Sequence, residues 1–194
     1  INKDYEGKEV HLICILKGGV FFTCELAKYI TVPVTIDFMS VSSYGNGMTS
    51  SGSITISQDL IMSLENREVL IIEDIVDSGR TLSYLAHMLE KRGPKSLRIC
   101  TLLDKPACRV SEVDVAYTGF EIDDLFVVGF GLDYAQKYRN LPYIGELKIK
   151  EDQSDEKMER LWLFCRDGGN NFDCHDFERF YVRMDRGELY LYTV

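Results

Sequence analysis

The chain has 194 residues, 45% of them hydrophobic and 27% charged, which is the balance of one globular domain with room for a small appendage. Its 22 Lys and Arg against 31 Asp and Glu give a net charge of −9. This charge argues against duplex DNA or an anionic membrane as the main partner, but it is compatible with a local pocket for a small phosphorylated molecule. No apolar run approaches the roughly 20 residues of a membrane span, and no signal peptide is visible. The six cysteines form no CxxC pair, so we expect a reduced, cytoplasmic protein.

Residues 1–150 alternate short apolar runs with helical patterns. Strands are predicted at 9–16, 34–41, 68–73, 96–103, 113–117 and 125–128, and helices at 20–30 and 81–92. The run 68–73 has a continuous apolar centre (VLII), as in a strand that is buried on both faces of a parallel sheet. This order of elements predicts an α/β fold with a parallel sheet, in which ligands bind beyond the C-terminal ends of the strands.

Two segments differ from this pattern. Residues 42–53 (SSYGNGMTSSGS) are polar and rich in Gly and Ser, so we expect a long loop of the kind that often serves as a functional lid. Residues 151–194 carry 11 acidic and 6 basic residues, which is −5 of the net charge, and this part of the chain starts with a charged, linker-like run at 150–160 (KEDQSDEKMER). Strands are predicted in this last part at 161–165 and 188–194. No zinc set at a suitable spacing is formed by its three possible ligands, Cys165, Cys174 and His175.

The segment 69–81 (VLIIEDIVDSGRT) is the most informative in the chain. An apolar strand leads into two carboxylates and then into a small, hydroxyl-rich loop that precedes a helix. The free backbone N–H groups and dipole of the helix start, with the hydroxyls of Ser78 and Thr81, can together hold one phosphate. Gly79 lets the backbone approach that phosphate closely. The GxxxxGK[ST] spacing of a Walker loop is absent, which argues against an ATP triphosphate held in that way.

Two adjacent carboxylates, Glu73 and Asp74, come directly before this loop. If the strand stays extended through both, we expect their side chains to point in different directions. Two acceptors suit a diol, such as the 2′ and 3′ hydroxyls of a ribose, and carboxylates also suit a hydrated Mg²⁺. Taken one at a time, the residues fit a simpler alternative, in which Asp77 caps the helix and the acids are solvated. The arrangement as a whole favours a ligand site.

The segment 69–81 closely resembles the 5-phosphoribosyl 1-diphosphate (PRPP) binding motif of the type I phosphoribosyltransferases. Three further segments resemble the hypoxanthine-guanine branch of that family: LICILKGGVFF at 12–22, DFMSVSSYGN at 37–46 and VVGFGLDYAQKYRNLPYIGEL at 127–147. The resemblance covers nearly all of residues 1–147, which we expect to form one phosphoribosyltransferase domain. The usual N-terminal segment of the family has no counterpart before Ile1. The tail from about Lys150 onward matches nothing in the family, and residues 148–194 are expected to be a C-terminal extension of unknown role.

The resemblance implies a type I phosphoribosyltransferase fold, in which a central parallel sheet is flanked by helices and carries a small hood region. It also implies purine salvage: transfer of the 5-phosphoribosyl group from PRPP to hypoxanthine or guanine, which yields IMP or GMP and releases pyrophosphate. Mg²⁺ is the expected cofactor, and a homodimer or homotetramer is the expected assembly. Neither nucleic acid nor a membrane is an expected partner.

For PRPP, the resemblance implies the following residue roles. The ribose hydroxyls are held by Glu73 and Asp74, which are also expected Mg²⁺ ligands together with Asp133. The 5′-phosphate is held by Asp77, Ser78, Gly79, Arg80 and Thr81. Asp77 also serves as the general base for the purine. Pyrophosphate is bound by Lys17, Gly18 and Arg139.

For the purine, the resemblance implies that Lys105 donates to the 6-oxo group, that Phe126 stacks on the base and that the backbone of Val127 reads the purine edge. The lid that excludes water begins at Ser42, Ser43 and Tyr44. Without the resemblance these residues have simpler explanations. A Lys at a strand end is usually solvated, a Phe is usually packed in the core, and a polar loop is usually a mobile surface segment.

Three alternatives to this enzyme remain open from the sequence. One is a non-catalytic, nucleotide-sensing regulatory protein on the same fold, and another is an inactive fragment. The third is an enzyme that prefers xanthine. The acidity of the chain argues against a regulator that binds RNA. Catalysis is favoured by the presence of a complete set of expected functional residues, namely Lys17, Asp77, Lys105, Asp133 and Arg139.

Overall fold

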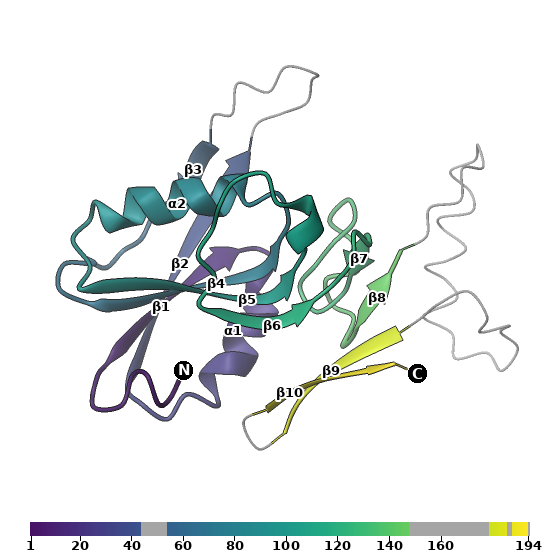
Figure 1. The fold of residues 1–194 in the computed structure, drawn as a ribbon, viewed down its shortest axis with the longest axis horizontal. Coiled ribbons are helices and arrows are strands. Elements are labelled where there is room, and N and C mark those ends of the chain that lie inside the picture. The colour runs from purple at the N-terminus through teal and green to yellow at the C-terminus, as the bar shows by residue number, and fades with distance from the viewer. Residues whose placement is uncertain (44–53, 148–178, 186–187, 194) are drawn as a thin grey trace, which may run out of the picture.

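The computed structural model describes residues 1–43, 54–147, 179–185 and 188–193, and its larger sheet has six strands. Their order is β3-β2-β1-β4-β5-β6 (Figure 1). The strands are β1 (Val10–Leu16), β2 (Val34–Ser43), β3 (Ile54–Gln58), β4 (Glu68–Val76), β5 (Ser96–Asp104) and β6 (Tyr117–Glu121). All neighbouring pairs are parallel except β2 and β3, which are antiparallel. The α/β class and the central, mostly parallel sheet are therefore confirmed.

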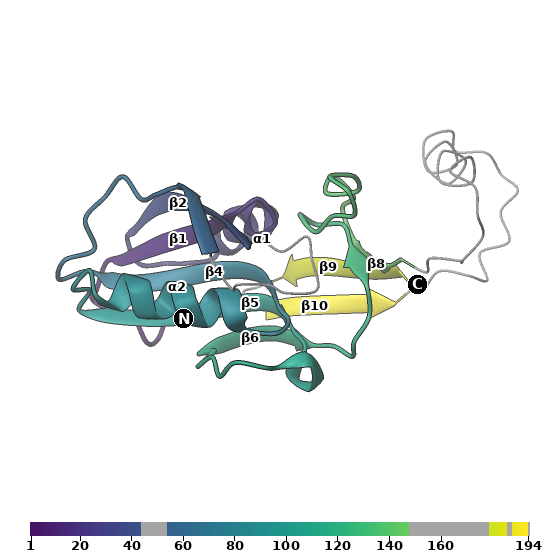
Figure 2. The same cartoon turned by 90° about the horizontal axis from the view of Figure 1, so that it is seen from above.

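Two helices, α1 (Gly19–Ala27) and α2 (Arg80–Glu90), lie on opposite faces of this sheet (Figure 2). Successive strand residues face opposite sides of a sheet, so each central strand contributes to two cores. One core joins Leu12 and Leu70 to α1. The other joins the next residue of each strand to α2, through Leu82, Leu85 and Leu89. Each of these buried leucines contributes about 1.5–3 kcal/mol to folding, which fixes the helix that follows the phosphate loop.

A smaller, four-stranded sheet in the order β10-β9-β8-β7 lies beside the larger one (Figure 1). It consists of β7 (Val127–Val128), β8 (Ile144–Glu146), β9 (Arg179–Asp185) and β10 (Glu188–Thr193). Strand β9 pairs antiparallel with β8 through Ile144↔Phe180 and Gly145↔Arg179. The extension thus continues a sheet that residues before 147 begin. The division of the chain at 147 stays a prediction.

The sequence patterns miss several elements. The strand predicted at 113–117 is wrong, because pairing with β5 begins only at Tyr117 and because Val113 and Val115 pack into the second core without strand pairing. Strands β3 and β8 were not predicted, since each is short and pairs antiparallel with other segments of the chain, β3 with β2 and β8 with β7 and β9. The prediction at 188–194 corresponds to β10, whereas the one at 161–165 lies outside the described residues.

Candidate active site

A cavity of about 350 Å³ opens where β1 and β4 end, at the C-terminal edge of the larger sheet. Its walls include the last residues of both strands and the loop before α2. This is the edge at which the sequence predicted ligand binding. The structure brings most of the predicted PRPP residues into this cavity, namely Gly18, Glu73, Asp74, Asp77, Ser78, Gly79, Thr81, Asp133 and Arg139.

The loop before α2 is fixed from behind by backbone contacts. The carbonyl of Ser78 accepts hydrogen bonds from the N–H groups of Val110 (2.9 Å) and Ser111 (3.0 Å). Gly79 has a φ of +78°, and a Cβ at this position would lie 2.5 Å from the Ser111 carbonyl oxygen, so only glycine fits. Helix α2 begins at Arg80 without a side-chain cap, which leaves the N–H groups of its first turn as donors for an anion.

The carboxyl groups of Glu73 and Asp74 converge, which makes the prediction that they point in different directions wrong. Both line the cavity, and the Glu73 side chain hydrogen-bonds that of Asp74. Burial, and next the negative charge of Asp74, raise the pKa of Glu73 well above its ordinary value. Neither carboxyl forms an ion pair with any residue in the described part of the chain. This pair therefore offers carboxyl groups that have no cationic partner among the described residues.

Gly18 makes this carboxyl arrangement possible. A Cβ on Gly18 would lie 1.7 Å from Oδ2 of Asp74, so any side chain there would displace the carboxyl group. A Cβ on Gly131 would in turn lie 2.1 Å from the Gly18 carbonyl oxygen. The loop after β1 and the loop around residue 131 are thus in direct backbone contact beside the cavity. The peptide bond between Leu16 and Lys17 is cis.

Asp133 and Arg139 form an ion pair in the wall of the cavity, with 2.5 Å between Oδ1 and Nη2. Arg139 also donates from Nη1 to the Gly131 carbonyl (2.6 Å), and Oδ2 of Asp133 accepts from the N–H of Gln136 (2.7 Å). The negative charge of Asp133 is therefore neutralised by Arg139, unlike the charges of the Glu73–Asp74 pair. Lys17 does not line the cavity, but its Nζ lies 3.1 Å from Oε1 of the same Gln136.

The three residues predicted to bind the purine lie outside the cavity lining. Lys105 is 6% exposed, and its Nζ lies 3.3 Å from Oδ1 of Asp124, so it is not a solvated strand-end lysine. Phe126 is 47% exposed, and its ring meets that of Tyr134 edge-on at 5.7 Å. Val127 is buried in β7.

Two other predicted groups are only partly placed. Arg80 is exposed at the start of α2 and does not line the cavity. Ser42 and Ser43, expected to open the lid loop, instead end β2 and pair with Thr55 and Ile54 of β3. Tyr44 and the rest of the predicted loop lie outside the described residues.

Sequence reasoning missed residues that support the phosphate loop. Arg109 forms an ion pair with Asp104, and both side chains are largely buried. The Cδ atom of Arg109 would lie 3.0 Å from a Cβ on Gly79, so this arginine packs directly behind the loop. Asp124, the partner of Lys105, was missed as well. The adjacent acids Asp123 and Asp124 signal a cation nearby, but no local spacing points to a lysine 19 residues away.

The oxygen ligands that line the cavity indicate whether the site can hold Mg²⁺. Within the ranges that the structure describes, no three His, Cys, Asp or Glu residues form a metal cage. Mg²⁺ is usually bound by one or two carboxylates together with substrate phosphates and waters, so a complete cage is not required. The unneutralised Glu73–Asp74 pair fits that pattern, whereas Asp133 must first release Arg139.

Comparison with known proteins identifies close relatives. The family described as "Phosphoribosyl transferase domain" matches residues 1–135. The "Hypoxanthine-guanine phosphoribosyltransferase" of Streptococcus mutans is 52% identical over 148 residues, which are 76% of this chain and 82% of that one. The "Bifunctional protein TilS/HprT" of Listeria monocytogenes is also 52% identical over 148 residues, but the chain spans only 23% of its length. A hypoxanthine phosphoribosyltransferase structure from Staphylococcus aureus is 50% identical, with a TM-score of 0.73 and coverage of 76% of this chain and 80% of that one.

Proposed function

The chain belongs to the phosphoribosyl transferase family, and we propose that it transfers the 5-phosphoribosyl group of PRPP to hypoxanthine or guanine in purine salvage. The observation that carries this proposal is the single cavity in which a phosphate loop adjoins a pair of unneutralised carboxyls. The high identity to a protein named hypoxanthine-guanine phosphoribosyltransferase supports the choice of bases. The products are IMP or GMP and pyrophosphate.

PRPP would occupy the cavity along its length. The 5′-phosphate accepts hydrogen bonds from the first-turn N–H groups of α2 and from the hydroxyls of Ser78 and Thr81. The ribose 2′ and 3′ hydroxyls donate to Glu73 and Asp74, whose carboxyl groups both line the cavity. Arg80, the remaining predicted contact, adds a positive charge at the rim of the cavity.

Pyrophosphate would bind where the loops after β1 and around residue 131 meet. The backbone at Gly18 lies beside Asp74, and Arg139 holds the opposite wall. A guanidinium matches a pair of pyrophosphate oxygens and can exchange Asp133 for them. Lys17 reaches the same region through Gln136 and adds a further cation.

Mg²⁺ would be held by Glu73 and Asp74, and by Asp133 once Arg139 has turned to pyrophosphate. When bound, the ion neutralises charge on the leaving pyrophosphate. No cationic side chain among the described residues competes with Mg²⁺ for the Glu73–Asp74 pair.

The purine would lie between the end of β5 and β7. Lys105 is held at the end of β5, where its N–H donates to the Val76 carbonyl, directly before Asp77 in the chain. Its ammonium group can turn from Asp124 to the 6-oxo group of the base. The exposed ring of Phe126 offers a stacking surface, and the backbone of Val127 offers hydrogen bonds to the purine edge.

In the transfer step, the bond between C1′ and the pyrophosphate oxygen breaks and a bond from C1′ to purine N9 forms. The electron pair of the broken bond leaves with pyrophosphate, and the purine gives up one proton. Asp77 lines the cavity and is the carboxylate placed to accept that proton. The expected lid, from Ser42, Ser43 and Tyr44 onward, would exclude water from the activated ribosyl centre.

A homodimer or homotetramer in the cytoplasm is the setting we expect for this activity. Cys14, Cys24, Cys100 and Cys108 are free thiols, which suits a reducing compartment. Among the described residues, no helix has the length and apolarity that crossing a bilayer requires.

The test is a transfer assay with PRPP and Mg²⁺ in which radiolabelled hypoxanthine, guanine and xanthine are supplied in parallel. We expect labelled IMP and GMP and little labelled xanthosine monophosphate. Folded protein that forms no labelled nucleotide from any base would refute the catalytic function. Preferential labelling from xanthine would instead correct the choice of base.

A further inference from the structure

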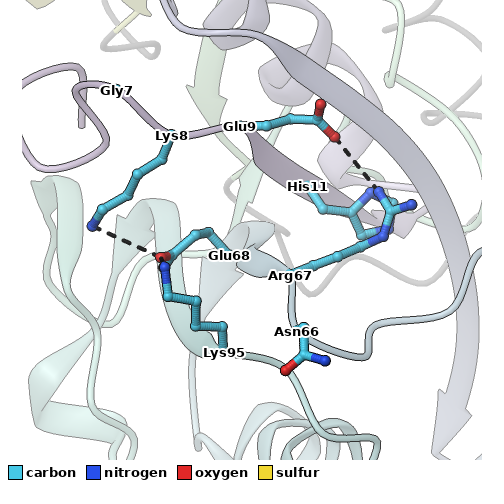
Figure 3. Close-up of a pocket in the computed structure, with 8 residues that line it drawn as sticks. All are labelled: Gly7, Lys8, Glu9, His11, Asn66, Arg67, Glu68 and Lys95. Atoms are coloured by element: carbon cyan, nitrogen blue, oxygen red, sulfur yellow. Dashed lines mark ion pairs between the residues drawn. The ribbon is translucent and has the colours of Figure 1, made fainter.

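A second cavity, of about 470 Å³, lies at the opposite end of the larger sheet from the PRPP cavity. It is formed where the chain enters β1, β4 and β5, and none of its residues has a role in the proposed reaction. Figure 3 shows its charged side chains in two groups, with Lys8 and Lys95 around Glu68 and with Arg67 near Glu9 and His11. The cavity is lined by Gly7, Lys8, Glu9, His11, Asn66, Arg67, Glu68 and Lys95.

This cavity carries an excess of positive charge within an acidic protein. Lys8 and Lys95 approach the same carboxylate, Glu68, at 3.9 Å and 2.9 Å. Hydrogen bonds from Ser96 and Lys95 lower the pKa of Glu68, so this partner stays ionised at neutral pH. One carboxylate cannot neutralise two ammonium groups.

The remaining ion pair does not change that excess. Arg67 lies 3.7 Å from the exposed Glu9, so these two charges balance. Three cations against two carboxylates leave one uncompensated positive charge in the cavity.

His11 adds a buried donor without a partner. The residue is 1% exposed, and its Nδ1 lies 2.8 Å from Oγ1 of Thr35. That oxygen also accepts from Nη1 of Arg67 at 3.5 Å, so we assign the hydroxyl proton of Thr35 to the bond with Nδ1. Burial, and next the charge of Arg67, lower the pKa of His11, which keeps the ring neutral with its proton on Nε2.

The Nε2 atom of His11 is buried and has no hydrogen-bond partner among the described residues. Buried N–H groups almost always have an acceptor, so an acceptor atom belongs beside this ring. Arg67 lies close to this ring, because its Nη1 and the Nδ1 of His11 both contact Oγ1 of Thr35.

We propose that this cavity binds a phosphate-type oxyanion, either inorganic phosphate or the phosphate group of a small phosphomonoester. The oxyanion is held by Lys8, Arg67 and Lys95, and the Nε2–H of His11 donates to it from the inner wall. A tetrahedral oxyanion supplies the acceptors for this donor set, and its negative charge is opposite in sign to the surplus charge of the cavity. A guanidinium and two ammonium groups are the usual protein ligands of phosphate. This site is independent of the proposed transfer reaction.

The test is a phosphate titration of ¹⁵N-labelled full-length protein that follows the imidazole ¹⁵N–¹H correlations at constant ionic strength. The chain has three histidines, and His11→Gln identifies the signal of interest. We expect Nε2 of His11 to shift saturably. His87, whose side chain is 71% exposed on α2, should stay in place as an internal control. Parallel titrations with ribose 5-phosphate and pyrophosphate distinguish a phosphomonoester from the free ion.

Lys95→Gln, at a position where the side chain is 62% exposed, is the first variant because the fold should tolerate it. We expect the half-saturating phosphate concentration to rise about tenfold in this variant, and further when Arg67→Gln is added. Lys91→Gln, an exposed lysine outside the cavity, is the matched control and should leave it unchanged. A His11 signal that no phosphate compound moves, as expected if water alone fills the cavity, would overturn the proposal. So would a half-saturation that Lys95→Gln and Arg67→Gln leave unaltered.

Discussion

Gly18 shows how strongly one residue can constrain this site. Its missing side chain is the space that Oδ2 of Asp74 occupies, and its carbonyl touches the backbone at Gly131. A methyl group at position 18 therefore disturbs the Asp74 carboxyl and the loop around residue 131 together, which are the proposed contacts of ribose and pyrophosphate. The geometry of this part of the cavity therefore depends on the absence of a Cβ atom at position 18.

We predict that Gly18→Ala lowers kcat/KM for PRPP by about 10²-fold, because misplacing a reacting group by about 1 Å has an effect of this size. Steady-state kinetics measure the change. Gly145→Ala is the matched control, since a Cβ there would meet its nearest neighbour at an ordinary 3.6 Å. Equal effects of the two substitutions would show that the loss is general and not due to Asp74.

Ionisation of the Glu73 carboxyl destabilises the unliganded protein. Its pKa is higher in the folded protein than in the unfolded chain, so stability falls as pH rises above the unfolded value of about 4.3. We predict that Glu73→Gln stabilises the unliganded protein. The gain in the free energy of unfolding should grow as the pH rises from about 4.3 to neutrality. Urea unfolding across this pH range measures it.

The same substitution should weaken PRPP binding by about tenfold, because a ribose hydroxyl loses a carboxyl acceptor. Glu6→Gln, at an exposed position outside the cavity, is the control for both measurements. A variant that is less stable than the parent at pH 7 would contradict the raised pKa of Glu73.

At the scale of elements, the phosphate loop is held between a helix and a supporting segment. Helix α2 anchors one end through three buried leucines, and the segment around residues 109–111 supports the other through the Ser78 carbonyl. Arg109 packs behind Gly79 and pairs with Asp104 at the end of β5. The loop is therefore preorganised before any phosphate arrives.

We predict that Arg109→Met destabilises the protein by about 3 kcal/mol, because it leaves the largely buried Asp104 carboxylate without a partner. The KM for PRPP should rise more than kcat falls, since the loop is displaced and the reacting groups are not. Adding Asp104→Asn should restore part of the stability. Lys28→Met, which breaks an exposed pair with Glu25, is the control and should cost at most about 1 kcal/mol. If Arg109→Met and Lys28→Met lowered the free energy of unfolding equally, the role of Arg109 in supporting the phosphate loop would be contradicted.

Contiguous features of the chain were predictable from the sequence. The phosphate loop and α2 follow from local chemistry, since Leu82, Leu85 and Leu89 recur at helical spacing directly after Ser78 and Gly79. The strand predicted at 113–117 failed because alternation of Val and Asp satisfies the strand pattern even where the segment only packs beneath a helix.

Features that depend on distant partners were not predictable. Nothing local indicates that Arg109 meets Asp104, that Lys105 meets Asp124, or that the carboxyls of adjacent strand residues converge. The same holds for β8 and β9, whose paired residues lie more than 30 positions apart. Such contacts are set by the packing of the sheets and not by spacing in the chain.

At the scale of the whole molecule, the C-terminal extension joins the sheet that carries Val127. Strand β9 covers the edge of β8, and β8 pairs in turn with β7. An uncovered β8 would expose backbone groups of Ile144 and Gly145, at about 1 kcal/mol for each hydrogen bond lost. The extension thus supports the sheet that carries the proposed purine contact at Val127.

We predict that deleting residues 148–194 lowers the unfolding midpoint and raises the KM for the purine, while the affinity for PRPP stays the same. Thermal unfolding, purine kinetics and PRPP calorimetry measure the three quantities. Truncation after Asp185 is the matched control, since it removes β10 but keeps β9 beside β8. A purine KM that the full deletion leaves unchanged would show that the extension does not support the base site.

Phosphoribosyl transfer in the cavity at the ends of β1 and β4 is tested most directly by Asp77→Asn in the full-length chain. The measurement is the rate of IMP formation from hypoxanthine and PRPP, together with the PRPP dissociation constant of the same protein. Asp77 lines the cavity and is the proposed proton acceptor, so we predict that PRPP still binds and that kcat falls by about 10²–10⁴-fold. An unchanged kcat in the variant would contradict the assignment of catalysis to this cavity.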